Sequence, residues 1–146
     1  MIRETHQRFI IEPEDKVLAE KYNFNKKVTT MRGMLGEIAL CKYLGIEYKN
    51  PGYDAVDVTD DFGTRYQVKT TTGGRMCYSH WIEQQKDPTK FDYYAFCVVD
   101  PDETRITIEA IMPSFTAHAL KEVHPKRRDL FRIKRKYNGR FFNDNS

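Results

Sequence analysis

Hydrophobic positions along the chain follow a helical period in one long stretch, residues 29–45. Apolar side chains recur there at steps of three and four residues, at Met31, Met34, Leu35, Ile38, Cys41 and Leu44. Thr30 is suited to cap the start of this helix, and Gly45 is suited to end it. The pattern predicts an amphipathic helix of about four turns.

Shorter stretches predict the other helices and the strands. Residues 12–24 and 114–123 are typical of short helices, the second with Ser114 as its N-cap. Residues 92–100 form a nearly continuous apolar run, and residues 105–112 follow after a turn, so both predict strands. This order of helices and strands is typical of a single α/β domain over residues 1–146.

A hairpin is predicted between the long helix and these strands, with its turn at residues 60–63. If the pairing centres on Phe62, Asp57 lies opposite Gln67, and Lys69 shares a face with Gln67. Asp57, Gln67 and Lys69 would then converge. A shift of one residue would place Asp54 opposite Lys69 instead, so Asp54 remains the alternative to Asp57.

Two glycines interrupt the long helix, although alanine would be more favourable by about 1 kcal/mol at each position. Gly33 and Gly36 therefore indicate that another segment approaches the helix closely. Glu37 follows directly, and Gly33 leaves clear space around its carboxylate.

The residue types in the hairpin are suited to phosphate chemistry. Carboxylate and amide oxygens, as in Asp57 and Gln67, are hard ligands of the kind that Mg²⁺ prefers, and Mn²⁺ is expected to substitute. A lysine such as Lys69 beside a bound phosphate can stabilise the charge that develops during hydrolysis. The alternative is an ordinary exposed ion pair of little energetic consequence.

Charge is segregated along the chain despite a net charge of only +3. Residues 121–140 hold nine Lys and Arg against two acids. A basic segment of this kind is suited to a polyanion, because Lys and Arg that replace phosphate counterions supply most of the sequence-independent affinity for nucleic acid. The residues expected to contact the phosphate backbone are Lys126, Arg127, Arg128, Arg132, Lys134, Arg135 and Lys136.

Several classes of protein are disfavoured. No apolar run approaches the roughly 20 residues that cross a bilayer, and no signal peptide is present, so a cytoplasmic location is expected. Cys41, Cys77 and Cys97 are odd in number and lack a C-x-x-C pair, which argues against a disulfide framework or a zinc site. No membrane partner and no small-molecule cofactor are expected.

The Gly-Glu pair at 36–37 on a helix, the strand residue Asp57, and Gln67 and Lys69 on the next strand resemble the PD-(D/E)XK nuclease superfamily. The resemblance covers about residues 30–100. It implies a restriction-endonuclease-like core, which is a mixed central β-sheet flanked by helices. It also implies that Glu37, Asp57 and Gln67 hold Mg²⁺ and that Lys69 is catalytic.

Two residues depart from the family pattern. Val56 stands where the family's name has proline, and Gln67 replaces the acid, as in the Q-x-K variant of Mrr-like members. The resemblance implies a metal-dependent endonuclease that cuts DNA as a homodimer or higher oligomer, of restriction, homing, junction-resolving or repair type. The alternatives are a catalytically inactive nucleic-acid-binding module of the same fold and a nuclease that acts on RNA.

Overall fold

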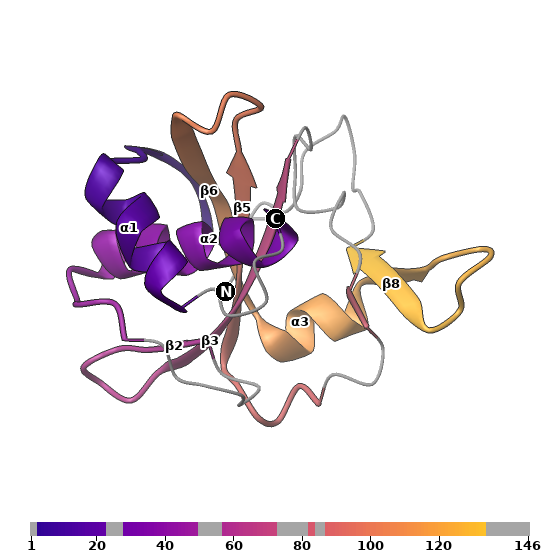
Figure 1. Ribbon diagram of the computed structural model, residues 1–146. Coiled ribbons are helices and arrows are strands. Elements are labelled where there is room, and N and C mark those ends of the chain that lie inside the picture. Colours follow the sequence, from indigo (N-terminus) through magenta and orange to yellow (C-terminus); the bar gives the residue numbers. More distant parts are fainter. Residues whose placement is uncertain (1–2, 23–27, 50–56, 73–81, 84–86, 134–146) are drawn as a thin grey trace.

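A five-stranded sheet forms the centre of the computed structural model, which describes residues 3–22, 28–49, 57–72, 82–83 and 87–133 (Figure 1). The helices, in chain order, are α1 (Pro13–Tyr22), α2 (Val28–Leu44) and α3 (Ser114–Ala119). The strands are β1 (Arg3–Ile10), β2 (Val58–Thr59), β3 (Arg65–Thr72), β4 (Ile82–Glu83), β5 (Tyr93–Val99), β6 (Arg105–Pro113), β7 (Lys121–Val123) and β8 (Leu130–Ile133).

The sheet is mixed. Its strand order is β1-β6-β5-β3-β2, and β3 pairs with β5 in parallel while the other neighbours in this sheet are antiparallel. A second, three-stranded sheet has the order β4-β8-β7. The predicted α/β class with a mixed sheet is confirmed.

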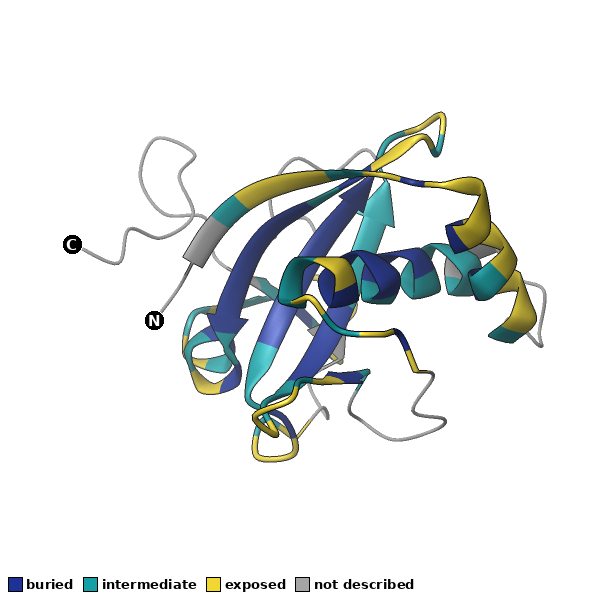
Figure 2. Ribbon diagram, turned by 90° about the vertical axis from the view of Figure 1, so that its left-hand side faces the viewer, coloured by how far each residue is buried: buried dark blue, intermediate teal, exposed yellow. Residues whose placement is uncertain are grey.

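Helix α2 lies across one face of the central sheet, and the strands beneath it are buried (Figure 2). Apolar side chains from both layers form the core on this face, among them Leu35, Ile38, Val68, Ala95, Cys97 and Ile108. Helix α1 packs beside α2, and an ion pair between Lys42 and the buried Asp15 joins the two helices. A smaller core on the opposite face includes Tyr94 and Phe96 of β5, Ala117 of α3 and Phe131 of β8.

Helix ends differ in part from the expectation. Gly45 follows the last residue of α2 with a φ of 72°, so its predicted role is confirmed. Thr30 is not the cap, because α2 begins at Val28. Ser114 is not a cap either: its hydroxyl donates to the carbonyls of Pro88 and Phe91.

The segment after Ser114 was expected to remain helical to residue 123, which is wrong. Helix α3 ends at Ala119, and Lys121–Val123 forms β7, which pairs with β8. Pairing with β8 and burial of Phe131 stabilise an extended chain where the local sequence is compatible with a helix. Strand β1 was not predicted at all.

The hairpin has the first of the two predicted registers. Val58 lies opposite Tyr66 and Thr59 opposite Arg65, which is the pairing that centres on Phe62. The Asp60 carboxylate accepts hydrogen bonds from the backbone N–H groups of Phe62 and Thr64, and Gly63 has a φ of 82°. Local turn chemistry therefore sets the register.

Among the described residues, no helix is both long enough and apolar enough to cross a membrane.

Candidate active site

Asp57 is fixed against β3 at the point where the short strand β2 begins. Its backbone N–H donates to the Tyr66 carbonyl over 2.9 Å, and its carboxylate Oδ2 accepts from the Val68 N–H over 2.8 Å. The carboxylate therefore lies at the outer edge of β3. Because the N–H and C=O of one strand residue point to the same side, the Val68 carbonyl is directed toward the same edge.

Glu37 approaches from α2. Burial, followed by the nearby carboxylate of Asp57, raises the pKa of Glu37 to about 8, although a hydrogen bond from the Tyr48 hydroxyl opposes the shift. That hydrogen bond joins Tyr48 Oη to Glu37 Oε1 over 3.1 Å. The negative charge of Asp57 therefore acts on Glu37 across the edge of β3.

Gln67 and Lys69 lie on the face of β3 that is turned away from α2. The neighbours that a Cβ at Gly36 would meet are Thr70 and Val68, so the even-numbered residues of β3 face the helix. Because side chains alternate along a strand, Gln67 and Lys69 face the other way. Glu37 therefore lies on the α2 side of β3 and the Gln-x-Lys pair lies on the other side, with the Asp57 carboxylate at the edge between them.

Gln67 has an unusual environment for an amide. It is 6% exposed, and its Oε1 atom is buried with no hydrogen-bond partner among the described residues. A buried carbonyl oxygen without a partner costs free energy unless a donor or a cation reaches it. A donor or a cation that reaches the Gln67 Oε1 atom would offset this cost.

These residues offer hard oxygen donors of the kind that divalent cations prefer. No three His, Cys, Asp or Glu side chains gather as a metal-binding cluster in the described part of the chain. The candidate oxygen donors are the Asp57 carboxylate and the Val68 carbonyl at the edge of β3, the Glu37 carboxylate on the α2 side, and the Gln67 amide on the other side. A positive charge there would offset the repulsion between the two carboxylates, and such an all-oxygen set is suited to Mg²⁺.

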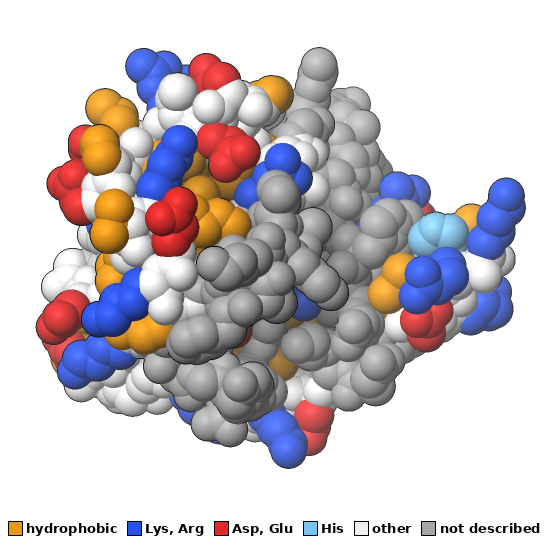
Figure 3. All heavy atoms as spheres, in the orientation of Figure 1, with side chains coloured by type: hydrophobic (Ala, Val, Ile, Leu, Met, Phe, Trp, Pro, Cys, Tyr) orange, Lys and Arg blue, Asp and Glu red, His pale blue; other side chains and the backbone are white. Residues whose placement is uncertain are grey.

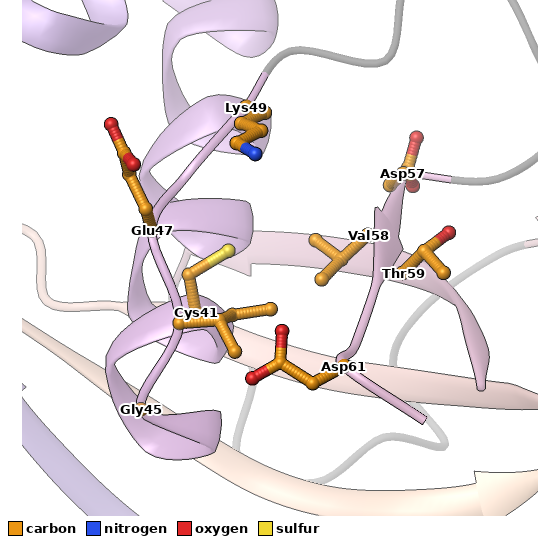
Figure 4. Close-up of a pocket in the computed structure, with 9 residues that line it drawn as sticks. Cys41, Gly45, Glu47, Lys49, Asp57, Val58, Thr59 and Asp61 are labelled. Atoms are coloured by element: carbon orange, nitrogen blue, oxygen red, sulfur yellow. The ribbon is translucent and has the colours of Figure 1, made fainter. Parts of the chain in front are cut away.

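A cleft of about 480 Å³ adjoins Asp57 (Figure 4). One wall comes from residues 45–49 after α2, and the other comes from β2 and the turn that follows it. Lys49 and Asp57 lie across from each other at one end, and Asp61 lies toward the other end. Neither this cleft nor Tyr48 was predicted from the sequence. The relevant signal was Gly45, whose positive φ turns the chain back along α2.

The basic residues lie mainly on the connection between β7 and β8, a hairpin that projects from the molecule (Figure 1), and Lys and Arg side chains gather there (Figure 3). Lys126, Arg127 and Arg128 are exposed on it. Arg127 pairs with Asp129 over 3.0 Å, and Arg132 of β8 pairs with Glu122 over 2.7 Å. Four of the expected contact residues are thus placed on or beside one hairpin.

The remaining candidates, Lys134, Arg135, Lys136 and the alternative acid Asp54, lie outside the described residues.

The described residues thus form an α/β protein with the Asp57 carboxylate fixed at one edge of β3 and a basic hairpin that projects from the fold. No protein-family model matches the sequence, and no curated protein matches it.

Proposed function

We propose that this protein is a metal-dependent endonuclease that hydrolyses DNA phosphodiester bonds. The observation that carries the proposal is the fixed Asp57 carboxylate at the edge of β3, whose charge acts on the buried Glu37, on a strand where the buried Oε1 of Gln67 has no hydrogen-bond partner among the described residues. Two carboxylates that interact, and a buried amide oxygen without a partner among the described residues, both cost free energy. A bound cation offsets both costs.

Each residue has a distinct role in this proposal. Glu37, Asp57 and Gln67 hold Mg²⁺, for which Mn²⁺ substitutes, and Lys69 positions the phosphate or the attacking water. A cation at this position supplies Lewis acidity toward a phosphoryl oxygen. Lys69 lies two residues after Gln67 on the same strand face, so its ammonium group stabilises negative charge on the phosphate that the site receives.

The arrangement of elements supports a restriction-endonuclease-like core. Helix α2 carries the first acid, the β2–β3 hairpin carries the remaining site residues, and β5 runs parallel to β3 after an intervening crossover. The basic hairpin at Lys126–Arg128 supplies contacts to the DNA backbone. A cut through both strands requires two sites, so a homodimer or higher oligomer accompanies this function.

Cleavage of supercoiled, linear and branched DNA in Mg²⁺ or Mn²⁺ tests the proposal. We expect the wild-type protein to cut at least one of these substrates and EDTA to stop it. Lys69→Ala should abolish cutting while DNA binding survives. Lys16→Ala, which removes an exposed lysine of α1, is the matched control and should cut normally. Intact DNA after incubation of a metal-loaded, folded wild-type protein would contradict the proposal.

A second candidate is a nucleic-acid-binding module that has lost its chemistry. The observation that favours it is that Gln67 and Lys69 face away from α2 and Glu37, together with a glutamine in place of an acid at position 67. Calorimetry separates the two functions, because the inactive module would show salt-sensitive DNA affinity without Mg²⁺ or Mn²⁺ binding. A comparison of matched DNA and RNA substrates decides which nucleic acid is cut.

A further inference from the structure

The connection between β7 and β8 folds into a closed loop. The His124 N–H donates to the Leu130 carbonyl over 3.0 Å, and the Leu130 N–H donates to the Arg127 carbonyl over 2.9 Å. In addition, Nδ1 of the His124 ring accepts hydrogen bonds from the backbone N–H groups of Lys126 and Arg127, each over 3.0 Å. These hydrogen bonds fix the backbone of the loop, so a partner that binds its side chains does not first have to order it.

The hairpin of β7 and β8 is anchored at its base and exposed at its tip. Phe131 of β8 is fully buried in the smaller core, at 0% exposure, whereas residues 125–129 at the tip are all exposed. The tip projects from the molecule (Figure 1), and Lys and Arg side chains gather on it (Figure 3). The major groove of B-DNA is about 12 Å wide and admits a two-stranded β-ribbon. A projecting hairpin can therefore reach the edges of bases, whereas a flat basic surface reaches only the phosphates.

Asp129 orients the guanidinium group of Arg127. Nε and Nη2 of Arg127 donate to the two carboxylate oxygens of Asp129, over 3.2 Å and 3.0 Å. This pairing uses one edge of the planar group. The other edge, formed by Nη1 and the second hydrogen of Nη2, has no acceptor among the described residues. An arginine edge with two parallel N–H groups matches two acceptors that lie side by side.

A base fits this edge of Arg127 better than a phosphate does. A phosphate beside Arg127 would also lie near the negative charge of Asp129, and the repulsion would offset part of the attraction. Guanine is uncharged and presents N7 and O6 side by side in the major groove, which are the acceptors in the commonest specific arginine contact. Lys126 and Arg128, on either side of Arg127, are exposed and suited to contact the phosphates.

We propose that Arg127, oriented by Asp129, reads guanine in the major groove of duplex DNA. This inference rests on the proposed function in one respect, the binding of DNA by the hairpin, and it adds a base contact to the backbone contacts. Arg127 then determines which sites the protein prefers, and Asp129 is a positioning residue that acts through it. Duplex RNA does not offer this contact, because its major groove is too deep and narrow for side chains to read.

Fluorescence anisotropy in EDTA, where metal-dependent cutting does not interfere, tests the inference with two duplexes of the same sequence. One contains guanine, and the other contains 7-deazaguanine, which lacks the N7 acceptor but keeps its base pairing and its charge. We expect the wild-type protein to bind the guanine duplex about tenfold more tightly, the size of one specific base contact. Arg127→Ala should bind both duplexes equally.

Two further variants separate the orientation of Arg127 from simple charge. Lys126→Ala is the matched control, because it removes an adjacent exposed cation. It should weaken binding to both duplexes and keep the wild-type ratio of affinities. Asp129→Ala should strengthen binding to both duplexes, since it removes a negative charge near the phosphates, and yet lower the ratio. A purely structural role of Asp129 would not produce these opposite changes.

Equal affinity of the wild-type protein for the two DNA duplexes would overturn the inference and leave the proposed function standing. So would a preference for guanine that survives in Arg127→Ala, or one of the same size on duplex RNA with the same substitution. A folded wild-type protein that neither binds nor cuts DNA would overturn both.

Discussion

Helix α2 and strand β3 touch at Gly36 and Thr70, where a Cβ atom on Gly36 would lie 2.0 Å from Oγ1 of Thr70. The same Cβ would lie 3.2 Å from Cγ1 of Val68. Only glycine therefore permits this approach. Because Glu37 is the next residue, the contact sets how far the Glu37 carboxylate stands above the sheet.

Gly36→Ala should lower the free energy of unfolding by about 1–3 kcal/mol, the usual cost of overpacking a core. Thr70 is β-branched and its Oγ1 is buried, so it cannot rotate away freely. Gly33→Ala is the matched control in the same helix. No atom lies within 4 Å of a Cβ at Gly33, so this change should stabilise the protein by up to about 1 kcal/mol. Urea denaturation measures both.

A double-mutant cycle tests the cause of the Gly36→Ala effect. Thr70→Ala removes the atom that would collide, so the pair Gly36→Ala and Thr70→Ala should be more stable than the sum of the single effects predicts. Two results would contradict this explanation: additive effects of the two substitutions on the free energy of unfolding, or no effect of Gly36→Ala. Either result would show that α2 can move away from β3 with little loss of stability.

Glu109 is a second buried acid, remote in sequence from the candidate site. It is the extra residue of a β-bulge in β6, between the pairs Phe96↔Ala110 and Cys97↔Ile108. The residue is 6% exposed, and its Oε2 has no hydrogen-bond partner among the described residues. Burial raises the pKa of Glu109 from its ordinary value of 4.5 to about 7.

Glu109→Gln should change how stability depends on pH. Because the pKa is higher in the folded state, the wild-type protein loses stability as pH rises from 4.5 through 7, where the buried carboxyl must ionise. The free energy of unfolding of the variant should equal that of the wild type near pH 4.5. Above pH 7 it should be larger than that of the wild type by on the order of 3 kcal/mol. Urea unfolding across this pH range measures the difference. Glu14→Gln, on the exposed face of α1, is the control and should keep the pH dependence of stability that the wild type has.

The basic hairpin should contribute a salt-dependent part of the DNA affinity. Replacing Lys126 and Arg128 by alanine removes two exposed cations, so the slope of log affinity against log salt should become shallower by about 2. Fluorescence anisotropy with labelled duplexes at several salt concentrations measures the slope. An unchanged slope would place the DNA contact on another surface.

The described thiols should react slowly in the folded protein. Burial, together with the negative charge of Glu37, raises the pKa of Cys41 to about 12, and burial also raises the pKa of Cys97. Thiolate is the reactive form, so iodoacetamide at pH 8 should modify both residues far more slowly than in urea. Mass spectrometry of peptides that contain Cys41 and Cys97 measures each rate. Fast native labelling would show that α2 opens readily from the sheet.

Local chemistry explains what the sequence predicted well. The hairpin register was predicted because Asp60 and Gly63 specify the turn within a few residues. Strands β5 and β6 were predicted because their apolar runs are buried on both faces. The end of α2 was predicted because Gly45 lies beyond the last apolar residue of the helical period.

Elements that depend on distant partners were missed. Strand β1 is polar and largely exposed, and only its pairing with β6 identifies it. Strand β7 was assigned to a helix because the pairing of Val123 with Phe131 is not visible locally. For the candidate site, only the resemblance to the PD-(D/E)XK superfamily implied that Glu37 would approach Asp57. The face of β3 that α2 covers depends on three-dimensional packing, so the orientation of Gln67 and Lys69 could not be derived.

Strand β1 joins β6 through pairs such as Arg3 with Ile111, which stand more than a hundred positions apart. During synthesis on the ribosome, β1 therefore cannot pair with β6 until residues 105–113 have been added to the chain. Whenever β1 is not paired, the backbone N–H and C=O groups along that edge of β6 are exposed, and a strand of another chain can pair with them. Clipping of the first ten residues would make that exposure permanent and favour self-association over the monomeric sheet.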